Sequence, residues 1–295
     1  MIKTPLTMLC DFDHLDDNHR VRRMAFLEFA KNGCPNIVLS DTLLAFIMRW
    51  APFADLLRDD LKATGCRFVD AHSPFGPHID LHVIDETEHR MAILRHSLAM
   101  EIAASFGVDT ICIHIGNGEI SLPGYTFEQY QATIIRSLKE LVPLAEKLGM
   151  TICIENIWTD ITTPESLLTI LKGVDSPHVG ICYDAGHANL MARDRGFEKS
   201  APKSTFLEKQ GKPVPYDDHI LEKLLPYVVN CHLHDNNGQT DQHTLPGRGD
   251  IDWPHIMGLL KQAPNLKCIQ SEVITTHAEV SIAEDCAKFK ELMEM

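Results

Sequence analysis

The chain of 295 residues lacks any apolar run long enough to cross a bilayer. Its apolar stretches are short, such as Met150–Ile154 before Glu155, whereas a membrane-spanning helix needs about 20 apolar residues. The first residues contain no apolar secretory segment, because Asp11 and Asp13 interrupt it. We therefore expect a cytoplasmic protein that does not enter a membrane.

Several common site motifs are missing as well. The nine cysteines include no Cys-x-x-Cys pair, and we expect reduced thiols rather than a disulfide framework. No Gly-x-Gly-x-x-Gly or P-loop motif is present, so neither a dinucleotide site nor a nucleotide-phosphate loop of the usual kind is expected.

Basic residues are also scarce. The 27 Lys and Arg residues oppose 41 Asp and Glu residues, which gives a net charge of −14. Binding to nucleic acid depends largely on Lys and Arg that neutralise phosphates, so this charge argues against a nucleic-acid partner. A local basic groove stays open. The hydrophobic content of 44 % is that of an ordinary globular protein with a large core.

One alternation runs through the whole chain. Short apolar runs rich in β-branched residues or Cys alternate with longer segments whose apolar residues recur at helical spacing, such as His19–Asn32, Glu86–Phe106 and Phe127–Leu148. The eight strand-like runs are Thr7–Phe12, Asn36–Ser40, Arg67–His72, Thr110–Ile115, Thr151–Ile157, Val179–Asp184, Val228–His234 and Lys267–Val273. Eight such units predict an α/β protein, a single-domain (β/α)₈ TIM barrel over residues 1–295. An open doubly wound sheet is the alternative.

Residues 190–218, between the sixth and seventh predicted strands, depart from this alternation. The segment is long and polar, and we expect a loop insertion at the barrel mouth rather than a second domain. Its part Met191–Lys212 holds more basic than acidic side chains. Two interpretations stay open: a solvated loop, or a lid that closes over an anionic group of a substrate.

Side chains with metal-binding or acid–base chemistry stand where the predicted strands end. The C-terminal ends of barrel strands form one mouth, so groups far apart in the sequence converge there. These residues are His72, His114, Glu155, Asp184, His187, His232, His234, Asp235 and Glu272, with Asp241 and His243 in the loop after the seventh strand.

Strand periodicity supports this convergence. Residues two apart on a strand share a face, and we expect each of three cysteines to point into the barrel beneath a polar group. The pairs are Cys112 with His114, Cys153 with Glu155 and Cys182 with Asp184. We interpret these thiols as packing residues of the core.

Glu155 and Glu272 each follow an apolar run, where an unpaired carboxylate would be costly to bury. A divalent cation bound by both groups would remove that cost. Carboxylates combined with His suit Mn²⁺ or Mg²⁺ better than a closed structural zinc site. The sequence therefore predicts a divalent metal ion at the mouth.

Around these residues the sequence resembles the xylose-isomerase-like barrel superfamily, which includes sugar isomerases and epimerases, inosose-type dehydratases and the endonuclease IV family. The resemblance covers almost the whole chain. Its most specific parts are CIEN around Glu155, CYDAGHAN around Asp184 and His187, and HLHDNNGQTDQHTLPGRGDIDW from His232 to Trp253.

The sugar-transforming members imply one divalent ion, with Mn²⁺ expected first and Mg²⁺ or Co²⁺ also fitting. The implied ligands are Glu155, Asp184, His232 and Glu272. The resemblance further implies that the two glutamates are an acid–base pair and that His187 contacts a substrate oxygen. We expect His72 and His114 to hold substrate hydroxyls. Ketose epimerases carry an Arg where this chain has Gly238, and the nearest Arg available for a substrate contact is Arg248.

The nuclease members imply a larger ligand set and a three-zinc cluster. That set is His72, His114, Glu155, Asp184, His187, His232, Asp241, His243 and Glu272, and every position is filled here. A three-zinc phosphodiesterase acting on abasic DNA is therefore one alternative function. A lyase or dehydratase acting on an oxidised sugar or glycoside with the same site is another.

We predict a metal-dependent isomerase or epimerase of a sugar, polyol or related carbonyl compound, acting in carbohydrate metabolism. One of Glu155 and Glu272 would remove the proton next to the carbonyl, and the other would return a proton. The ion would stabilise the enediolate that forms between these steps. The expected partner is a small molecule, and a homo-oligomer stays open.

Overall fold

The computed structural model describes residues 2–12, 15, 18–116, 124–194, 213 and 215–295. Eight parallel strands close into a barrel, because β1 pairs with both β2 and β8. This closure confirms the predicted (β/α)₈ barrel and excludes the open sheet. The strands are β1 (Leu6–Met8), β2 (Asn36–Leu39), β3 (Arg67–His72), β4 (Thr110–Ile113), β5 (Thr151–Glu155), β6 (Val179–Asp184), β7 (Val228–Leu233) and β8 (Cys268–Ser271).

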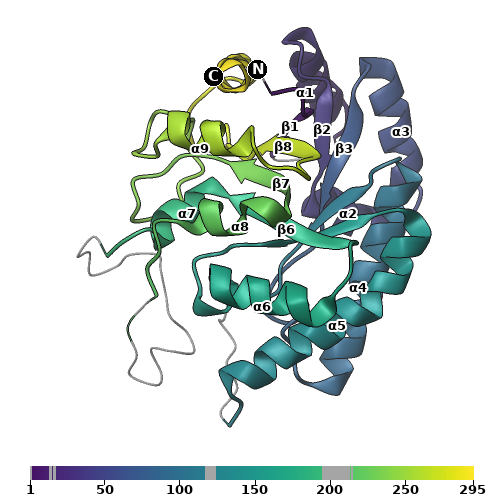
Figure 1. The fold of residues 1–295 in the computed structure, drawn as a ribbon. Helices are drawn as coiled ribbons and strands as arrows, with labels where there is room; N and C mark the ends of the chain where they lie inside the picture. Colours follow the sequence, from purple (N-terminus) through teal and green to yellow (C-terminus); the bar gives the residue numbers. More distant parts are fainter. Residues whose placement is uncertain (1, 13–14, 16–17, 117–123, 195–212, 214) are drawn as a thin grey trace.

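Helices surround the strands on the outside of the barrel (Figure 1). They are α1 (His19–Lys31), α2 (Asp41–Arg49), α3 (Phe53–Thr64), α4 (Glu86–Ser105), α5 (Phe127–Leu148), α6 (Pro164–Val174), α7 (Ala185–Met191), α8 (Ile220–Leu224), α9 (Trp253–Leu260) and α10 (Ile282–Glu294), with short 3₁₀ turns η1 (Asp160–Thr162) and η3 (Leu225–Tyr227). Within the described ranges, none of them combines the length and apolar character that a bilayer crossing requires.

Local sequence signals set the helix ends. Thr126 begins α5 with a reciprocal capping box to Gln129, and Gly149 ends it with a φ of 65°, a conformation in which a side chain is disfavoured. Thr163 caps α6, whose first residue is Pro164, the position where a missing N–H costs nothing. These ends fall where the sequence places them.

The predicted runs for β3 and β6 match the observed strands, and the other six extend one to four residues beyond them. β1 ends at Met8 rather than Phe12, and β5 ends at Glu155 rather than Ile157. Leu9 and Ile157 leave the sheet and line a cavity at the mouth instead. These two residues are therefore apolar because they form part of the cavity wall. The pattern of apolar residues in a sequence cannot distinguish such a wall from a buried strand.

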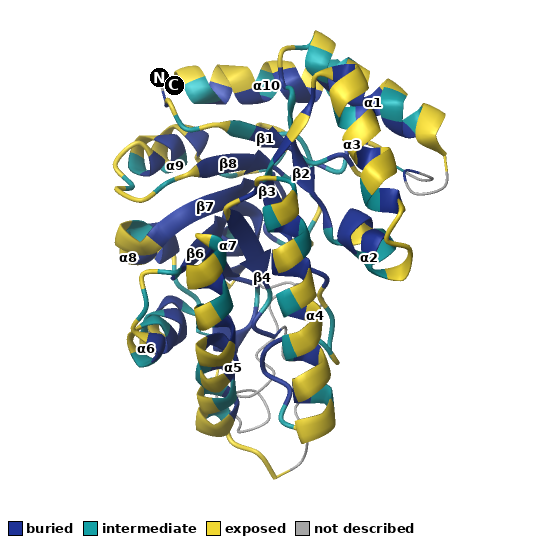
Figure 2. Cartoon of the chain, turned by 90° about the vertical axis from the view of Figure 1, so that its right-hand side faces the viewer, coloured by how far each residue is buried: buried dark blue, intermediate teal, exposed yellow. Residues whose placement is uncertain are grey.

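The core has two parts. The larger lies between the strands and the inner faces of the helices, while the outer helix faces are exposed (Figure 2). The smaller lies inside the barrel and contains Cys112, Cys153, Cys182 and Val229. All nine cysteines are buried and none forms a disulfide. The expected packing role of the three strand thiols is confirmed.

A polar layer lies deeper in the barrel, below these thiols. The Asp70 carboxylate accepts hydrogen bonds from Thr110 Oγ1 at 2.6 Å and from Asn230 Nδ2 at 2.9 Å. Burial raises the pKa of Asp70. Asp70 stands two residues before His72 on β3, as Cys153 stands before Glu155 on β5, so each strand stacks its inward side chains in layers that lead up to the mouth.

Most of the predicted insertion 190–218 lies outside the described residues, which exclude 195–212 and 214. Its first two residues belong to α7, and the Asp217 N–H donates to the Met191 carbonyl at 2.8 Å. The described ends of the segment are therefore adjacent, next to the C-terminal end of β6. The lid and its basic side chains stay a prediction.

The buried carboxylate of Asp285 allows the cost of placing a charge in the core to be measured. This fully buried carboxylate on α10 accepts a hydrogen bond from Ser271 Oγ at 3.0 Å. Burial raises the pKa of Asp285 to about 7, and the hydrogen bond from Ser271 only partly opposes this. An unfolded Asp ionises near pH 3.9, so this group stabilises the fold fully below that pH and loses its contribution as the pH rises to about 7.

We predict that the substitution Asp285→Asn stabilises the folded protein, relative to the wild type, by an amount that increases with pH. Relative to the wild type, its free energy of unfolding should rise by about 2–3 kcal/mol between pH 5 and pH 8. Urea unfolding at both pH values, followed by circular dichroism, measures this difference. A difference independent of pH would mean that Asp285 is ionised in the folded protein.

Candidate metal centre

The four residues predicted to hold one ion converge inside the mouth of the barrel. Glu155 and Asp184 end β5 and β6, His232 lies on β7, and Glu272 follows β8. One ligand atom from each residue lies within 4.8 Å of the others. The Glu272 side chain is 12 % exposed, and the other three are at most 1 % exposed. We call these four residues the quartet.

The quartet contains buried polar atoms without hydrogen-bond partners among the described residues, namely Asp184 Oδ2 and His232 Nε2. Leaving such an atom unsatisfied costs about 1–3 kcal/mol, and a coordinated cation would satisfy both. Three carboxylates and one imidazole are a donor set suited to Mn²⁺ or Mg²⁺. The residues present therefore fit a divalent ion.

The two glutamates of the quartet differ in proton affinity. Burial acts to raise the pKa of Glu155, but His232, His114 and His187 hold it well below its usual range. Burial raises the pKa of Glu272, and the charge of Glu155 adds to this despite the opposing effect of His232. His232 Nδ1 lies 3.1 Å from Glu155 Oε1 and 3.1 Å from Glu272 Oε1. One imidazole thus contacts two carboxylates with opposite pKa shifts.

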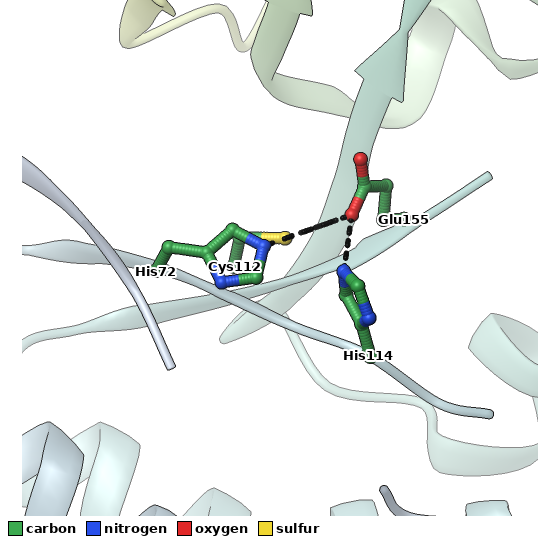
Figure 3. Close-up of side chains that lie close together, drawn as sticks. All are labelled: His72, Cys112, His114 and Glu155. Carbon is green, nitrogen blue, oxygen red and sulfur yellow. Dashed lines mark hydrogen bonds and ion pairs between the residues drawn. The ribbon is translucent and has the colours of Figure 1, made fainter. Parts of the chain in front are cut away.

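A second group of side chains surrounds the other oxygen of Glu155. Figure 3 shows His72, Cys112 and His114 directed toward Glu155 Oε2, at 3.9, 3.5 and 2.9 Å. Phe75, which is 49 % exposed, packs on both imidazoles, with ring centroids 4.5 Å from His114 and 5.3 Å from His72. Glu155 is therefore contacted through both of its oxygens.

A third group lies on the β6–β7 side and contains His187, His234, Asp241 and His243, again with ligand atoms within 4.8 Å of one another. Asp241 Oδ2 lies 2.8 Å from His243 Nε2 and 3.6 Å from His187 Nε2. Although burial opposes it, the two histidines lower the pKa of Asp241. Burial alone would lower the pKa of His243, but Asp241 raises it to about 9. All nine residues of the larger predicted ligand set thus surround one site.

The loop that carries Asp241 and His243 is held in place by Asp235. This buried carboxylate accepts hydrogen bonds from the Gly247 N–H at 2.7 Å and from Trp253 Nε1 at 2.9 Å. A Cβ on Gly249 would lie 2.2 Å from Asp235 Oδ1, so only glycine allows this approach. The Asp235 carboxylate therefore links the beginning of the segment His232–Trp253 to its end through hydrogen bonds.

His234 is one of the predicted strand-end residues without a predicted role, and the structure shows that it links the third group, to which it belongs, with the quartet. Its Nε2 lies 3.3 Å from Asp184 Oδ1 and 3.7 Å from Asp241 Oδ1. The ring is fully buried and stacks on His243 with a centroid distance of 3.8 Å. A Cβ on Gly186 would lie 1.9 Å from His234 Cε1. The period of two on β7, which puts His234 on the same face as His232, is the signal that identifies it.

The three groups open into one cavity of about 440 Å³. Its wall includes most of the predicted substrate-contacting residues, together with apolar and polar side chains from the first strands. The lining residues are Leu9, Asp11, Ser40, Asp41, Thr42, His72, Phe75, His114, Glu155, Ile157, Trp158, His187, Asp241, His243, Gln270, Glu272 and Ile274. Pockets of this size accommodate small molecules.

Arg248 does not belong to this wall. Its Nη1 donates to the Ala278 carbonyl at 2.6 Å, so the guanidinium binds a neighbouring loop rather than the cavity. The structure therefore does not bring Arg248 together with the other predicted site residues.

The family model described as xylose isomerase-like TIM barrel matches residues 26–292. The chain belongs to this family. An uncharacterized protein of Methanocaldococcus jannaschii, MJ1311, is 29 % identical over 207 residues, which cover 66 % of this chain and 60 % of that protein. This chain therefore matches less than two thirds of the length of MJ1311.

Solved structures with the same fold cover nearly the whole chain. A D-tagatose 3-epimerase-like protein is 20 % identical with a TM-score of 0.72, covering 98 % of this chain and 97 % of its own. The 3-keto-D-glucoside 4-epimerase YcjR of E. coli is 15 % identical with a TM-score of 0.71, covering 99 % and 100 %. The IOLI protein with a bound zinc atom is 17 % identical with a TM-score of 0.68, covering 98 % and 96 %. At these identities the similarity shows the fold.

The position of His234 generates a prediction. We expect His234→Leu to weaken Mn²⁺ binding by about 10- to 100-fold, because groups that orient metal ligands typically contribute this much. His234→Gln, whose amide keeps polar atoms near Asp184, should recover part of the loss. Titration of metal-free protein, with free Mn²⁺ followed by electron paramagnetic resonance, measures the affinity.

His178→Leu is the matched control. His178 is a half-buried histidine that precedes β6 at the opposite end of the barrel and binds the Met150 carbonyl. It should leave Mn²⁺ affinity unchanged. Wild-type affinity in a folded His234→Leu variant would show that this residue does not support the centre.

Proposed function

We propose that the protein is a divalent-metal-dependent isomerase or epimerase of a sugar, polyol or related carbonyl compound. The observation that carries this proposal is the pair Glu155 and Glu272. Both line one cavity, both lie 3.1 Å from His232 Nδ1, and their pKa values are shifted in opposite directions. Two carboxylates that flank one cavity and contact the same imidazole supply the two groups that proton removal and return at carbon require.

The quartet would hold the ion, with Mn²⁺ expected first and Mg²⁺ or Co²⁺ as further candidates. When bound, it supplies stabilisation of negative charge on a substrate oxygen. One of Glu155 and Glu272 removes the proton next to the carbonyl, and the other returns a proton to the enediolate. His72, His114 and His187 line the cavity and orient hydroxyl groups.

The cavity supports a small-molecule substrate. Its volume of about 440 Å³ lies within the range of ligand pockets, and the apolar wall formed by Phe75, Trp158 and Ile274 would exclude water from the reacting carbon. The solved structures of similar fold include two proteins named as sugar epimerases or epimerase-like. We infer a role in carbohydrate metabolism in the cytoplasm. Elimination from an oxidised sugar or glycoside would use the same proton removal, and the assay below also detects it.

One observation favours a second candidate, a three-zinc phosphodiesterase acting on abasic DNA. The three ligand groups are contiguous. Glu155 belongs to both the quartet and the His72–His114 group, and His234 of the third group lies next to Asp184 of the quartet and to Asp241. The net charge of −14 and the carboxylates of Asp11 and Asp41 in the cavity wall oppose the binding of a polyanion. We therefore favour the isomerase or epimerase.

Metal content separates the two candidates. We expect protein purified without chelator to hold about one Mn, Mg or Co ion per chain by elemental mass spectrometry, the number that the four-ligand set implies. The double substitution Asp241→Ala with His243→Ala should keep that ion, because it leaves the quartet intact. Three zinc ions in the wild type, falling to fewer in the double variant, would favour the phosphodiesterase instead.

Proton transfer is tested on the glutamates. In a screen of free and phosphorylated sugars and polyols in D₂O, the wild type should exchange the hydrogen at the carbon next to the carbonyl, seen by NMR. Glu155→Gln and Glu272→Gln should each lower this exchange by about 10²- to 10⁴-fold, the usual contribution of an acid–base group. Asp285→Asn, which alters a buried carboxylate in the helix layer, should keep it. A glutamine variant with more than about a tenth of wild-type exchange would exclude that residue as acid or base.

A further inference from the structure

The outer face of α4 carries a row of exposed apolar side chains. Met91 is 57 % exposed, Leu94 is 62 % exposed and Leu98 is 40 % exposed. Their spacing of three and four residues places them on one side of the helix. The opposite side packs into the core through Ala92, Ala99, Met100 and Ala103 together with the buried His89 and His96. We call Met91, Leu94 and Leu98 the α4 stripe.

Among the described residues, the neighbouring helix α5 carries no such stripe of large apolar side chains. α4 has 20 residues and α5 has 22, and the two pack side by side with their outer faces exposed (Figure 2). The exposed positions of α5 include the charged residues Arg136, Lys139, Glu140 and Glu146. Exposed apolar residues in a row on one helix are typical of a surface that another protein covers.

Charged residues stand at the two ends of the α4 stripe with opposite signs. Arg90 precedes Met91, and Glu101 lies one turn beyond Leu98; both residues are exposed. Reversing the direction of a second, identical helix therefore places its Glu101 near Arg90 and its Arg90 near Glu101. The pattern is self-complementary under a two-fold axis, as an isologous interface requires.

We propose that the α4 stripe binds a second copy of this chain, with α4 antiparallel to α4 of that copy. Leu94 packs on Leu98 of the second copy at the centre, where the three-and-four spacing forms a seam between two helices. Arg90 pairs with Glu101 of the second copy on each side of this centre.

The net negative charge of the chain explains why an interface between two copies needs opposite charges at the ends of the α4 stripe. Two copies that each carry a net charge of −14 repel one another over most of their surfaces. Arg90 provides positive charge at one end of the apolar row, opposite Glu101 of the second copy, so attraction is local to this face. Opposite charges across an interface set its register and suppress other partners.

Sedimentation velocity over a range of concentrations tests the proposal on the full chain. The wild type should be a dimer. Leu94→Glu should raise the dissociation constant by at least about 30-fold, because each dimer would bury two unpaired carboxylates. Met24→Glu, a substitution at a 70 % exposed apolar residue of α1, should leave the dimer unchanged and serves as the control.

Charge reversal tests the register. Arg90→Glu alone and Glu101→Arg alone should each weaken the dimer several-fold by placing like charges together. The combination of both should restore it to near the wild-type dissociation constant. A wild type that stays monomeric at all concentrations, an intact dimer in Leu94→Glu, or a failure of the combined variant to recover would each overturn the proposal.

Discussion

The site depends on one constraint, which is the electrostatic cost of holding carboxylates away from water. Glu155 and Asp184 are almost fully buried, and Glu272 and Asp241 are largely so. Each is stable only beside positive charge or hydrogen-bond donors. The histidines of three neighbouring groups supply part of this compensation, and the polar atoms still lacking partners mark where a cation would supply the rest.

The barrel meets this constraint by its register. Side chains that point inward recur every second residue. A single strand can therefore place a polar side chain deep in the barrel, a thiol above it and a ligand at the mouth. β5 shows this sequence, because Cys153 packs in the interior and Glu155 emerges above it. A small thiol fills the narrow interior without adding a charge, and the charged groups are confined to the one layer where cations can reach them.

Much of this organisation could be predicted from the sequence, because it follows from periodicity. The alternation of short and long apolar segments indicates the barrel, and ligand-type residues at successive strand ends indicate the mouth. Contacts that depend on loop paths could not be predicted. Arg248 is close to the site in sequence, yet its guanidinium binds Ala278 because the loop that Asp235 closes directs it away. The sequence predicts Leu9 and Ile157 as strand residues, because an apolar cavity wall and a buried strand have the same composition.

The strands that supply the metal ligands determine where substitutions can alter substrate preference. The quartet comes from β5 to β8, whereas Leu9, Asp11, Ser40, Asp41 and Thr42, from the segments after β1 and β2, face the same cavity without belonging to any ligand group among the described residues. Coordination and proton transfer therefore constrain the second half of the barrel. They also constrain His72 and His114 at the ends of β3 and β4, which contact Glu155. The segments after β1 and β2 are constrained by the shape and polarity of what they touch. Substitutions after β1 and β2 can accumulate without disturbing the chemistry. Divergence in substrate preference should thus be concentrated in the segments after β1 and β2, and a chimaera that exchanges these segments between family members would inherit a new preference on an unchanged reaction centre.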